Sequence, residues 1–305
     1  MKENQESRTA LLTAYLRGYH SEHVNPKIFD DFMANKILTV EERNSFDQYI
    51  LSGLKAFDPK LAASFPDEAT ALAFSMQIIA GSPQVLSRAR FTEDLLEEAV
   101  KQGIKQYVIL GAGLDTFAFR HPEILEQLQV FEVDHPDTQN YKLHRLEELK
   151  WEIPPQMHFV PVDFTKESLA TALTSASYDP TALTFFNWLG VTYYLSYDVV
   201  LSTLSTIADI SSAGSIVVFD YLDTDAFDSE KAAPRVKGML FAAQQMGEKM
   251  NIGFNPSSLM DELNKVSLNL QENLGPSDIQ ARYFQGRPDK YYALEHLHLA
   301  SVKVK

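Results

Sequence analysis

The chain has 305 residues, of which 45% are hydrophobic and 22% charged, values that are ordinary for a globular protein. Its net charge of −14 argues against a nucleic-acid partner, because binding to phosphates requires a basic surface. The absence of cysteine excludes disulfides, thiolate catalysis and cysteine-ligated zinc. No apolar run reaches the roughly 20 residues of a membrane helix. The beginning of the chain, MKENQESRTA, lacks an apolar signal core, so we expect a cytoplasmic protein that does not contact membranes.

The first hundred residues are predicted to be helical. Apolar residues recur there at three- and four-residue spacings, which is the pattern of an amphipathic helix, in segments 47–57, 68–79 and 91–101. Thr92 is a candidate N-cap for the third segment, and Gly103 follows its end. We therefore expect residues 1–103 to form a helical cap, or lid, packed on a core of residues 104–305.

From position 107 onward, short apolar runs alternate with amphipathic stretches. The predicted strands are 107–111, 130–134, 158–163, 183–188 and 215–221, and helices are predicted near 137–149, 166–175 and 196–210. This alternation is typical of right-handed βαβ units. A helix at 256–265 and a strand pair at 268–272 and 293–302 complete the core, which also holds a helical insertion around 226–290. The predicted fold class is α/β, with a mostly parallel sheet and helices on both faces.

The first predicted strand runs into the turn Gly111-Ala112-Gly113. In a doubly wound sheet, ligands bind at the carboxyl ends of the strands, and glycine lets the backbone approach them closely. A dinucleotide-binding turn would place a third glycine at position 116, where this chain has Thr116. Asp134 ends the second strand 23 positions after Gly111, which is the spacing of a ribose-binding acid. S-adenosylmethionine has a ribose but no pyrophosphate and fits this pattern; a tight turn without a ligand is the alternative.

A second acid, Asp163, ends the predicted third strand and is followed by Phe164. In adenosylmethionine enzymes, an acid at this position faces the adenine amino group, with an apolar neighbour against the ring. An aspartate at a strand end is also a common helix N-cap, so both interpretations stay open.

Three runs of sequence together resemble the leucine carboxyl methyltransferase family: RARFTEDLLEEAVKQGIKQYVILGAGLDTFAFR, FEVDHPDTQNYKLHRL and LGVTYYLS. The resemblance spans roughly residues 9–300 and is greatest to bacterial polyketide or natural-product O-methyltransferases. It implies a Rossmann-like class I methyltransferase fold with a seven-stranded sheet and S-adenosyl-L-methionine as cofactor. It also implies that an arginine before the glycine turn holds the carboxylate of the cofactor's methionine part. Arg88 matches best and Arg90 second, and a guanidinium suits a carboxylate because it donates two parallel hydrogen bonds.

The sequence departs from the family at one position. Eukaryotic members that methylate proteins carry a glutamate where this chain has Leu189. That contact to the cofactor is therefore either lost or replaced by Asn187 and Trp188, just upstream. The departure also favours a small metabolite as methyl acceptor over a C-terminal leucine carboxylate.

The acceptor and a catalytic base are less well defined by the sequence. A carboxylate acceptor needs no base, whereas a hydroxyl does. His135 and Tyr194 are candidate bases, although His135 also lies on the cofactor side and Tyr194 also suits an apolar wall. The candidates for acceptor binding are Tyr15, Tyr19, Tyr193, Tyr194 and Tyr221. No metal site is expected, because the pairs His20/His23 and His296/His298 lack a third ligand at metal-binding spacing.

The predicted function is S-adenosylmethionine-dependent methyl transfer to a hydroxyl or carboxyl oxygen of a small natural-product molecule, free or bound to a carrier. One alternative is a carboxyl methyltransferase acting on a protein C-terminus. A second is a nicotinamide oxidoreductase, which Thr116 disfavours. A third is a non-catalytic partner subunit with the same fold. The oligomeric state is left open.

Overall fold

A computed structural model describes residues 7–163 and 167–305 of the chain. Its described residues contain a seven-stranded sheet with strand order β3-β2-β1-β4-β5-β7-β6. The strands are β1 (Gln106–Leu110), β2 (Gln129–Asp134), β3 (Met157–Pro161), β4 (Thr184–Trp188), β5 (Ile216–Leu222), β6 (Leu268–Leu274) and β7 (Leu297–Val304). Strands β1 to β5 pair in parallel, and β7 runs antiparallel between β5 and β6. The predicted fold class is confirmed.

The centre of the sheet is buried on both faces. Every residue of β1 (QYVIL) and of β4 (TFFNW) is buried, as expected for parallel strands covered by helices. The strand order reverses between β1 and β4, because β2 and β3 extend to one side and β5 to the other. The carboxyl ends of β1, β2 and β4 therefore meet at the switch point, where a doubly wound sheet binds its ligand.

Helices form two apolar layers against the sheet. One face packs against α6 (Gly81–Lys101), α12 (Pro234–Gln245) and α14 (Pro276–Ile279). The other packs against α10 (Leu169–Ser175), α11 (Tyr197–Asp209) and α13 (Leu259–Lys265). The remaining helical elements of the core lie between these strands and helices in the chain. They are α7 (Phe117–Arg120), α8 (Pro122–Leu125), α9 (Pro136–Leu149), η1 (Thr192–Tyr194), η2 (Thr224–Phe227) and the π-helical turn Gln280–Phe284.

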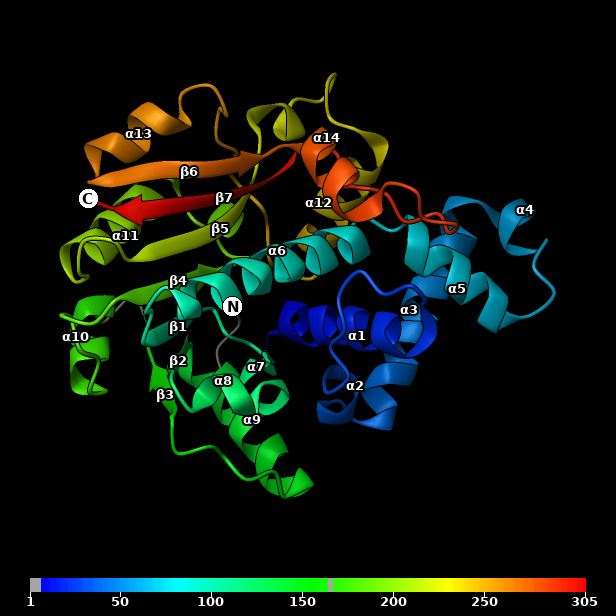
Figure 1. Cartoon of the computed structure of the whole chain (residues 1–305). Coiled ribbons are helices and arrows are strands. Elements are labelled where there is room, and N and C mark those ends of the chain that lie inside the picture. Colours follow the sequence, from blue (N-terminus) through cyan, green and yellow to red (C-terminus); the bar gives the residue numbers. More distant parts are fainter. Residues whose placement is uncertain (1–6, 164–166) are drawn as a thin grey trace.

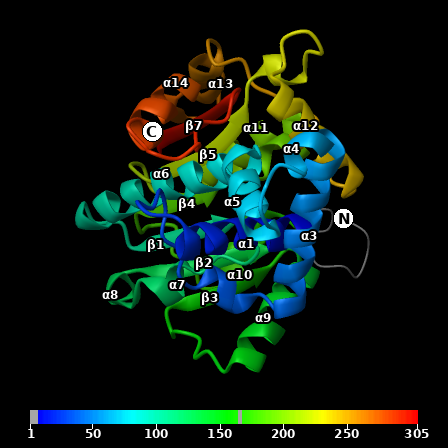
Figure 2. The ribbon, with the colours of Figure 1, turned by 90° about the vertical axis from the view of Figure 1, so that its right-hand side faces the viewer.

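The N-terminal helices form a third apolar cluster beside the sheet. They are α1 (Arg8–His23), α2 (Ala34–Ile37), α3 (Val40–Phe57), α4 (Pro59–Ala62) and α5 (Glu68–Ile78). Figures 1 and 2 show α1, α2, α3 and α5 gathered at one side of the sheet. Their cluster reaches the sheet layer through Leu114 and through Leu146 of α9. Because α6 contributes both to one sheet layer and to this N-terminal cluster, the boundary drawn at residue 103 stays a prediction.

Two helix predictions were wrong in detail. The helix predicted at 91–101 begins ten residues earlier, at Gly81, so Thr92 lies buried in its middle and is not an N-cap. The helix predicted at 47–57 begins at Val40, because Thr39 and Glu42 form a capping box ahead of the apolar stripe. Among the described residues, no helix has both the length and the hydropathy of a membrane span.

Candidate functional site

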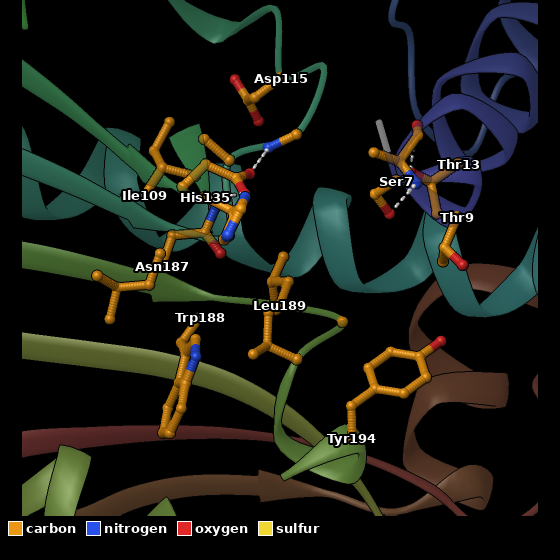
Figure 3. Close-up of a pocket in the computed structure, with 18 of the residues that line it drawn as sticks. Ser7, Thr9, Thr13, Ile109, Asp115, His135, Asn187, Trp188, Leu189 and Tyr194 are labelled. Carbon is orange, nitrogen blue, oxygen red and sulfur yellow. Dashed lines mark hydrogen bonds between the residues drawn. The ribbon is translucent and has the colours of Figure 1, made fainter. Parts of the chain in front are cut away.

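A cavity of about 1000 Å³ lies at the carboxyl ends of β1, β2 and β4. Its wall combines the glycine turn, the loops after β2, β3 and β4, helices α1 and α6, and residues 247–251. Part of this wall is drawn in Figure 3. Most of the predicted site residues meet here. They are Arg88, Gly111, Ala112, Gly113, Asp134, His135, Asp163, Asn187 and Tyr194. Phe164 lies outside the described residues.

The glycine turn has a backbone conformation that L side chains rarely adopt. The φ angles of Gly111 and Gly113 are 73° and 53°. A Cβ atom at Gly111 would lie 2.7 Å from Cγ2 of Val191, and one at Gly113 would lie 3.0 Å from Cβ of Ala10 in α1. The turn is therefore compressed between the loop after β4 and the first helix, and both glycines are required sterically.

Asp134 holds the glycine turn against the end of β2. Its Oδ2 accepts a hydrogen bond from the N–H of Gly113 at 2.5 Å, and its Oδ1 accepts one from the N–H of His135 at 2.6 Å. Burial raises the pKa of Asp134, and the two backbone donors oppose this shift only in part. The carboxylate lines the cavity and suits the ribose role predicted for it, which stays a prediction.

Arg88 lies almost buried in α6 and is fixed by two partners. Its Nη1 donates to Oδ2 of Asp220 at 3.1 Å and to the hydroxyl of Tyr193 at 2.8 Å. The other oxygen of Asp220 accepts the N–H of Gly190 at 2.6 Å. Burial lowers the pKa of Arg88, but the neighbouring Tyr193 and Asp220 outweigh burial and the net shift is upward. Nε and Nη2 make no hydrogen bond to another described residue, which leaves donors for a planar anion in the cavity.

Asn187 presents an acceptor that lacks a partner. Its Nδ2 donates to the hydroxyl of Tyr107 at 2.8 Å, whereas its buried Oδ1 has no hydrogen bond within the described residues. Buried polar atoms rarely stay unpaired in proteins. Because Asn187 lines the cavity beside Leu189, a donor group of a ligand would satisfy this oxygen.

Of the five tyrosines expected to bind the acceptor, Tyr194 lines the cavity. Burial raises its pKa, and the neighbouring Thr9 opposes this shift only in part, so the phenol stays protonated at neutral pH. A protonated phenol can orient an acceptor but is a poor proton acceptor. This argues against Tyr194 as the catalytic base.

The structure places the other four tyrosines away from the cavity wall, which corrects the expectation of direct acceptor contact. Tyr15 donates to Asp47 inside the helical cluster, and Tyr19 stacks on His23 with ring centres 4.3 Å apart. The remaining two have partners elsewhere. Tyr193 is bonded to Gln84 and Arg88, and Tyr221 stacks on His298 and donates to Asn273.

His135 is engaged as the N-cap of α9. Its Nδ1 accepts a hydrogen bond from the N–H of Asp137 at 3.3 Å. The ring is half-buried on the cavity wall next to Asp134. This placement supports the cofactor side for His135, and its role as a base stays a prediction.

Thr116, the residue at the position of a third glycine, takes part in a buried polar cluster. Its hydroxyl donates to Oδ1 of Asp31 at 2.6 Å and accepts from Nε of Arg120 at 3.0 Å. Arg17 of α1 donates to Oδ2 of Asp31 at 2.8 Å and to the carbonyl of Leu114 at 2.8 Å. Burial raises the pKa of Asp31, but the charges of Arg17 and Arg120 lower it by more. The net pKa of Asp31 is therefore below its ordinary value. The turn is thus tied to α1 through one carboxylate.

Several cavity residues were missed by the sequence analysis. Thr9 and Thr13 line the cavity from the face of α1 that also carries Arg17, an expected member of an aromatic and basic cluster over the substrate, at spacings of four residues. That polar stripe was a readable signal, because residues four apart share a helix face. Glu248 and Asn251 gave no such signal, since they lie in an irregular segment after α12.

Comparison with known proteins agrees with this geometry. The model of the leucine carboxyl methyltransferase family matches residues 10–208. YktD of Bacillus subtilis, provisionally named an S-adenosyl-L-methionine-dependent methyltransferase, is 37% identical over 298 residues, which cover 98% of each chain.

Two solved structures resemble the chain at low sequence identity and bear on the fold alone. One is a protein of the DUF574 family from Streptomyces avermitilis, with a TM-score of 0.55 and 14% identity over 79% of this chain and 92% of its own. The other, described as an unproven methyltransferase, is from Thermobifida fusca, with a TM-score of 0.53 and 18% identity over 79% and 89%. Because the family model covers more than half of the chain and the Bacillus relative aligns along nearly all of it, the chain belongs to the leucine carboxyl methyltransferase family.

Proposed function

We propose that this S-adenosyl-L-methionine-dependent methyltransferase methylates an oxygen atom of a small natural-product molecule. The family name describes methylation of a carboxyl oxygen, and the relative YktD is named for the same cofactor. The observation that supports a small acceptor is the cavity itself. Its volume of about 1000 Å³ is at the upper end of ordinary small-molecule sites, and α1 and residues 247–251 form part of its wall.

The residues at the sheet end fit this cofactor. The unpaired Oδ1 of Asn187 suits the ammonium group of the methionine part, and the remaining donors of Arg88 suit its carboxylate. Asp134 would accept the ribose hydroxyls, and Asp163 the adenine amino group. When bound, the cofactor supplies a methyl group on a positively charged sulfur.

The chain's own contribution to the reaction is mainly positional. Holding two reactants in line contributes up to roughly 7–11 kcal/mol to lowering a barrier. Arg88 would hold the methionine part of the cofactor and Asp134 its ribose, and the Tyr194 hydroxyl points into the part of the cavity next to α1. The departing thioether is neutral, so no residue is needed to protonate it.

The test begins with calorimetry using S-adenosylhomocysteine, S-adenosylmethionine and NAD. We expect the two sulfur ligands to bind and NAD not to bind. Transfer of an isotopically labelled methyl group is then measured to catechol, 2-phenylethanol, benzoic acid and a peptide ending in leucine. Ether or ester formation on a small molecule supports the proposal. Methylation of the peptide alone would favour the protein-directed alternative, and binding without transfer to any oxygen would favour a non-catalytic subunit.

A further inference from the structure

Glu248 is a half-buried carboxylate in the cavity wall, in the segment that follows α12. Residues 247–251 are attached to the loop after β4 at two points. The N–H of Asn251 donates to the carbonyl of Tyr193 at 2.7 Å, and its Nδ2 donates to the carbonyl of Tyr194 at 3.3 Å. The position of Glu248 beside Tyr194 is therefore held by the main chain of the loop after β4.

The partners of Glu248 are hydroxyl groups. Ser7 Oγ donates to Oε1 at 3.2 Å, and Thr9 Oγ1 donates to Oε2. The hydroxyl of Tyr194 points toward Thr9 (Figure 3). A line of hydroxyls thus leads from the wall of the cavity to one carboxylate.

Two other acids of the cavity are engaged differently. Glu93 is paired with Arg120, and Asp134 accepts two backbone N–H groups. Glu248 forms no ion pair with a described residue, so its charge is not neutralised by a neighbouring cation. A carboxylate that is hydrogen-bonded only by hydroxyls can exchange one of them for the hydroxyl of a bound molecule.

We propose that Glu248 is the general base that accepts the proton of a hydroxyl-bearing acceptor, which makes alcohols or phenols the substrate class. This inference rests on the proposed O-methyl transfer. The acceptor oxygen forms a bond to the methyl carbon while the carbon–sulfur bond breaks and its electron pair stays on sulfur. The acceptor proton passes to Glu248, so the products are a methyl ether, a neutral thioether and a protonated glutamate that returns its proton to water.

A carboxylic acid acceptor does not fit this wall as well. Such an acceptor has no proton to lose at neutral pH, and it would place a second negative charge beside Glu248, which is unfavourable. The carboxyl alternative would instead use Lys249, which is exposed and also lines the cavity. Dependence of the reaction on Glu248 therefore indicates a hydroxyl acceptor, whereas dependence on Lys249 indicates a carboxylate acceptor.

The test compares Glu248→Gln with the wild-type protein. We expect methyl transfer to catechol or 2-phenylethanol to fall about 10²–10⁴-fold, the usual contribution of a general base. The affinities for S-adenosylhomocysteine and for 5′-methylthioadenosine, which lacks the amino-acid part, should stay within about threefold, a difference of under 1 kcal/mol. Glu248→Asp, which keeps the charge, should lose less. Glu230→Gln makes the same change at an exposed site away from the cavity and should keep the wild-type rate.

Three outcomes would overturn this role. The first is a wild-type rate in Glu248→Gln. The second is a change in affinity for S-adenosylhomocysteine but not for 5′-methylthioadenosine, which would place Glu248 at the amino-acid part of the cofactor. The third is methylation of benzoic acid that Lys249→Met abolishes and Glu248→Gln spares. Failure of the proposed function looks different, because the wild-type protein itself would then form no methylated small molecule.

Discussion

The two sides of the cavity are assembled in different ways. On the sheet side, Gly111, Asp134 and Asn187 each lie at or just after the end of a strand, and the strand order brings them together. On the helical side, Ser7 and Thr9 meet Glu248 across 241 and 239 positions of sequence. The sheet side is therefore specified by local motifs, whereas on the helical side the meeting of Ser7 and Thr9 with Glu248 depends on tertiary packing. Variants on each side can show whether this contrast extends to function.

The largest effect on cofactor binding is expected from Asp134→Ala on the sheet side. Hydrogen bonds to a charged carboxylate contribute about 1.5–3 kcal/mol each, so losing the ribose contacts should weaken S-adenosylhomocysteine binding about 10²-fold. Calorimetry measures this directly. Asp209→Ala, at the exposed end of α11, serves as control. Unchanged affinity in Asp134→Ala would show that the ribose assignment is wrong.

A smaller, ligand-selective effect is expected from Asp220→Asn, which weakens the hold on Arg88. Binding of S-adenosylhomocysteine should fall about tenfold, equivalent to about 1.4 kcal/mol, because the guanidinium loses the partner that orients it. Binding of 5′-methylthioadenosine should hardly change, since that ligand lacks the carboxylate. Equal losses for both ligands would mean that Asp220 only stabilises the fold.

The smallest effect concerns the helical side and depends on pH. His20 of α1 is fully buried, and burial lowers its pKa from 6.5 to about 4. Below pH 6.5 the unfolded chain therefore binds a proton at His20 that the folded chain excludes. The contribution of neutral His20 to the free energy of unfolding is present above pH 6.5 and is lost as the pH falls toward 4. Between roughly pH 7.5 and 5.5 the loss should be about 1 kcal/mol.

Urea unfolding at the two pH values measures that loss. In His20→Gln the amide oxygen can still accept the N–H of Ile28, which His20 Nε2 accepts at 2.8 Å, but the side chain does not titrate. The variant should therefore lose less stability on acidification than the wild-type protein. An identical pH dependence in both proteins would exclude His20 as the source.

The same contrast explains what the sequence could predict. Parallel strands appear as continuous apolar runs, so the sheet, its turn and its acids could be located from local patterns. Residue type alone does not give side-chain direction, and this is why most of the tyrosines were misplaced. Asp220 and Tyr221 are adjacent on β5, yet they point to opposite faces, and Asp220 is the one that contacts Arg88. Glu248 was missed because nothing in its own segment indicates that Thr9 is its neighbour.

The carboxylate of Asp31 has a thermodynamic consequence. It accepts hydrogen bonds from Thr116 of the cofactor turn, from Arg17 of α1 and from the N–H of Ala34 in α2. A shift of the turn therefore changes the energy of the first helix, and the reverse holds by the same amount. If a bound acceptor holds α1 in place, it should raise the affinity for the cofactor. The cofactor should then raise the affinity for the acceptor by the same factor. The threonine that departs from a dinucleotide-binding turn thus ties that turn to the first helix.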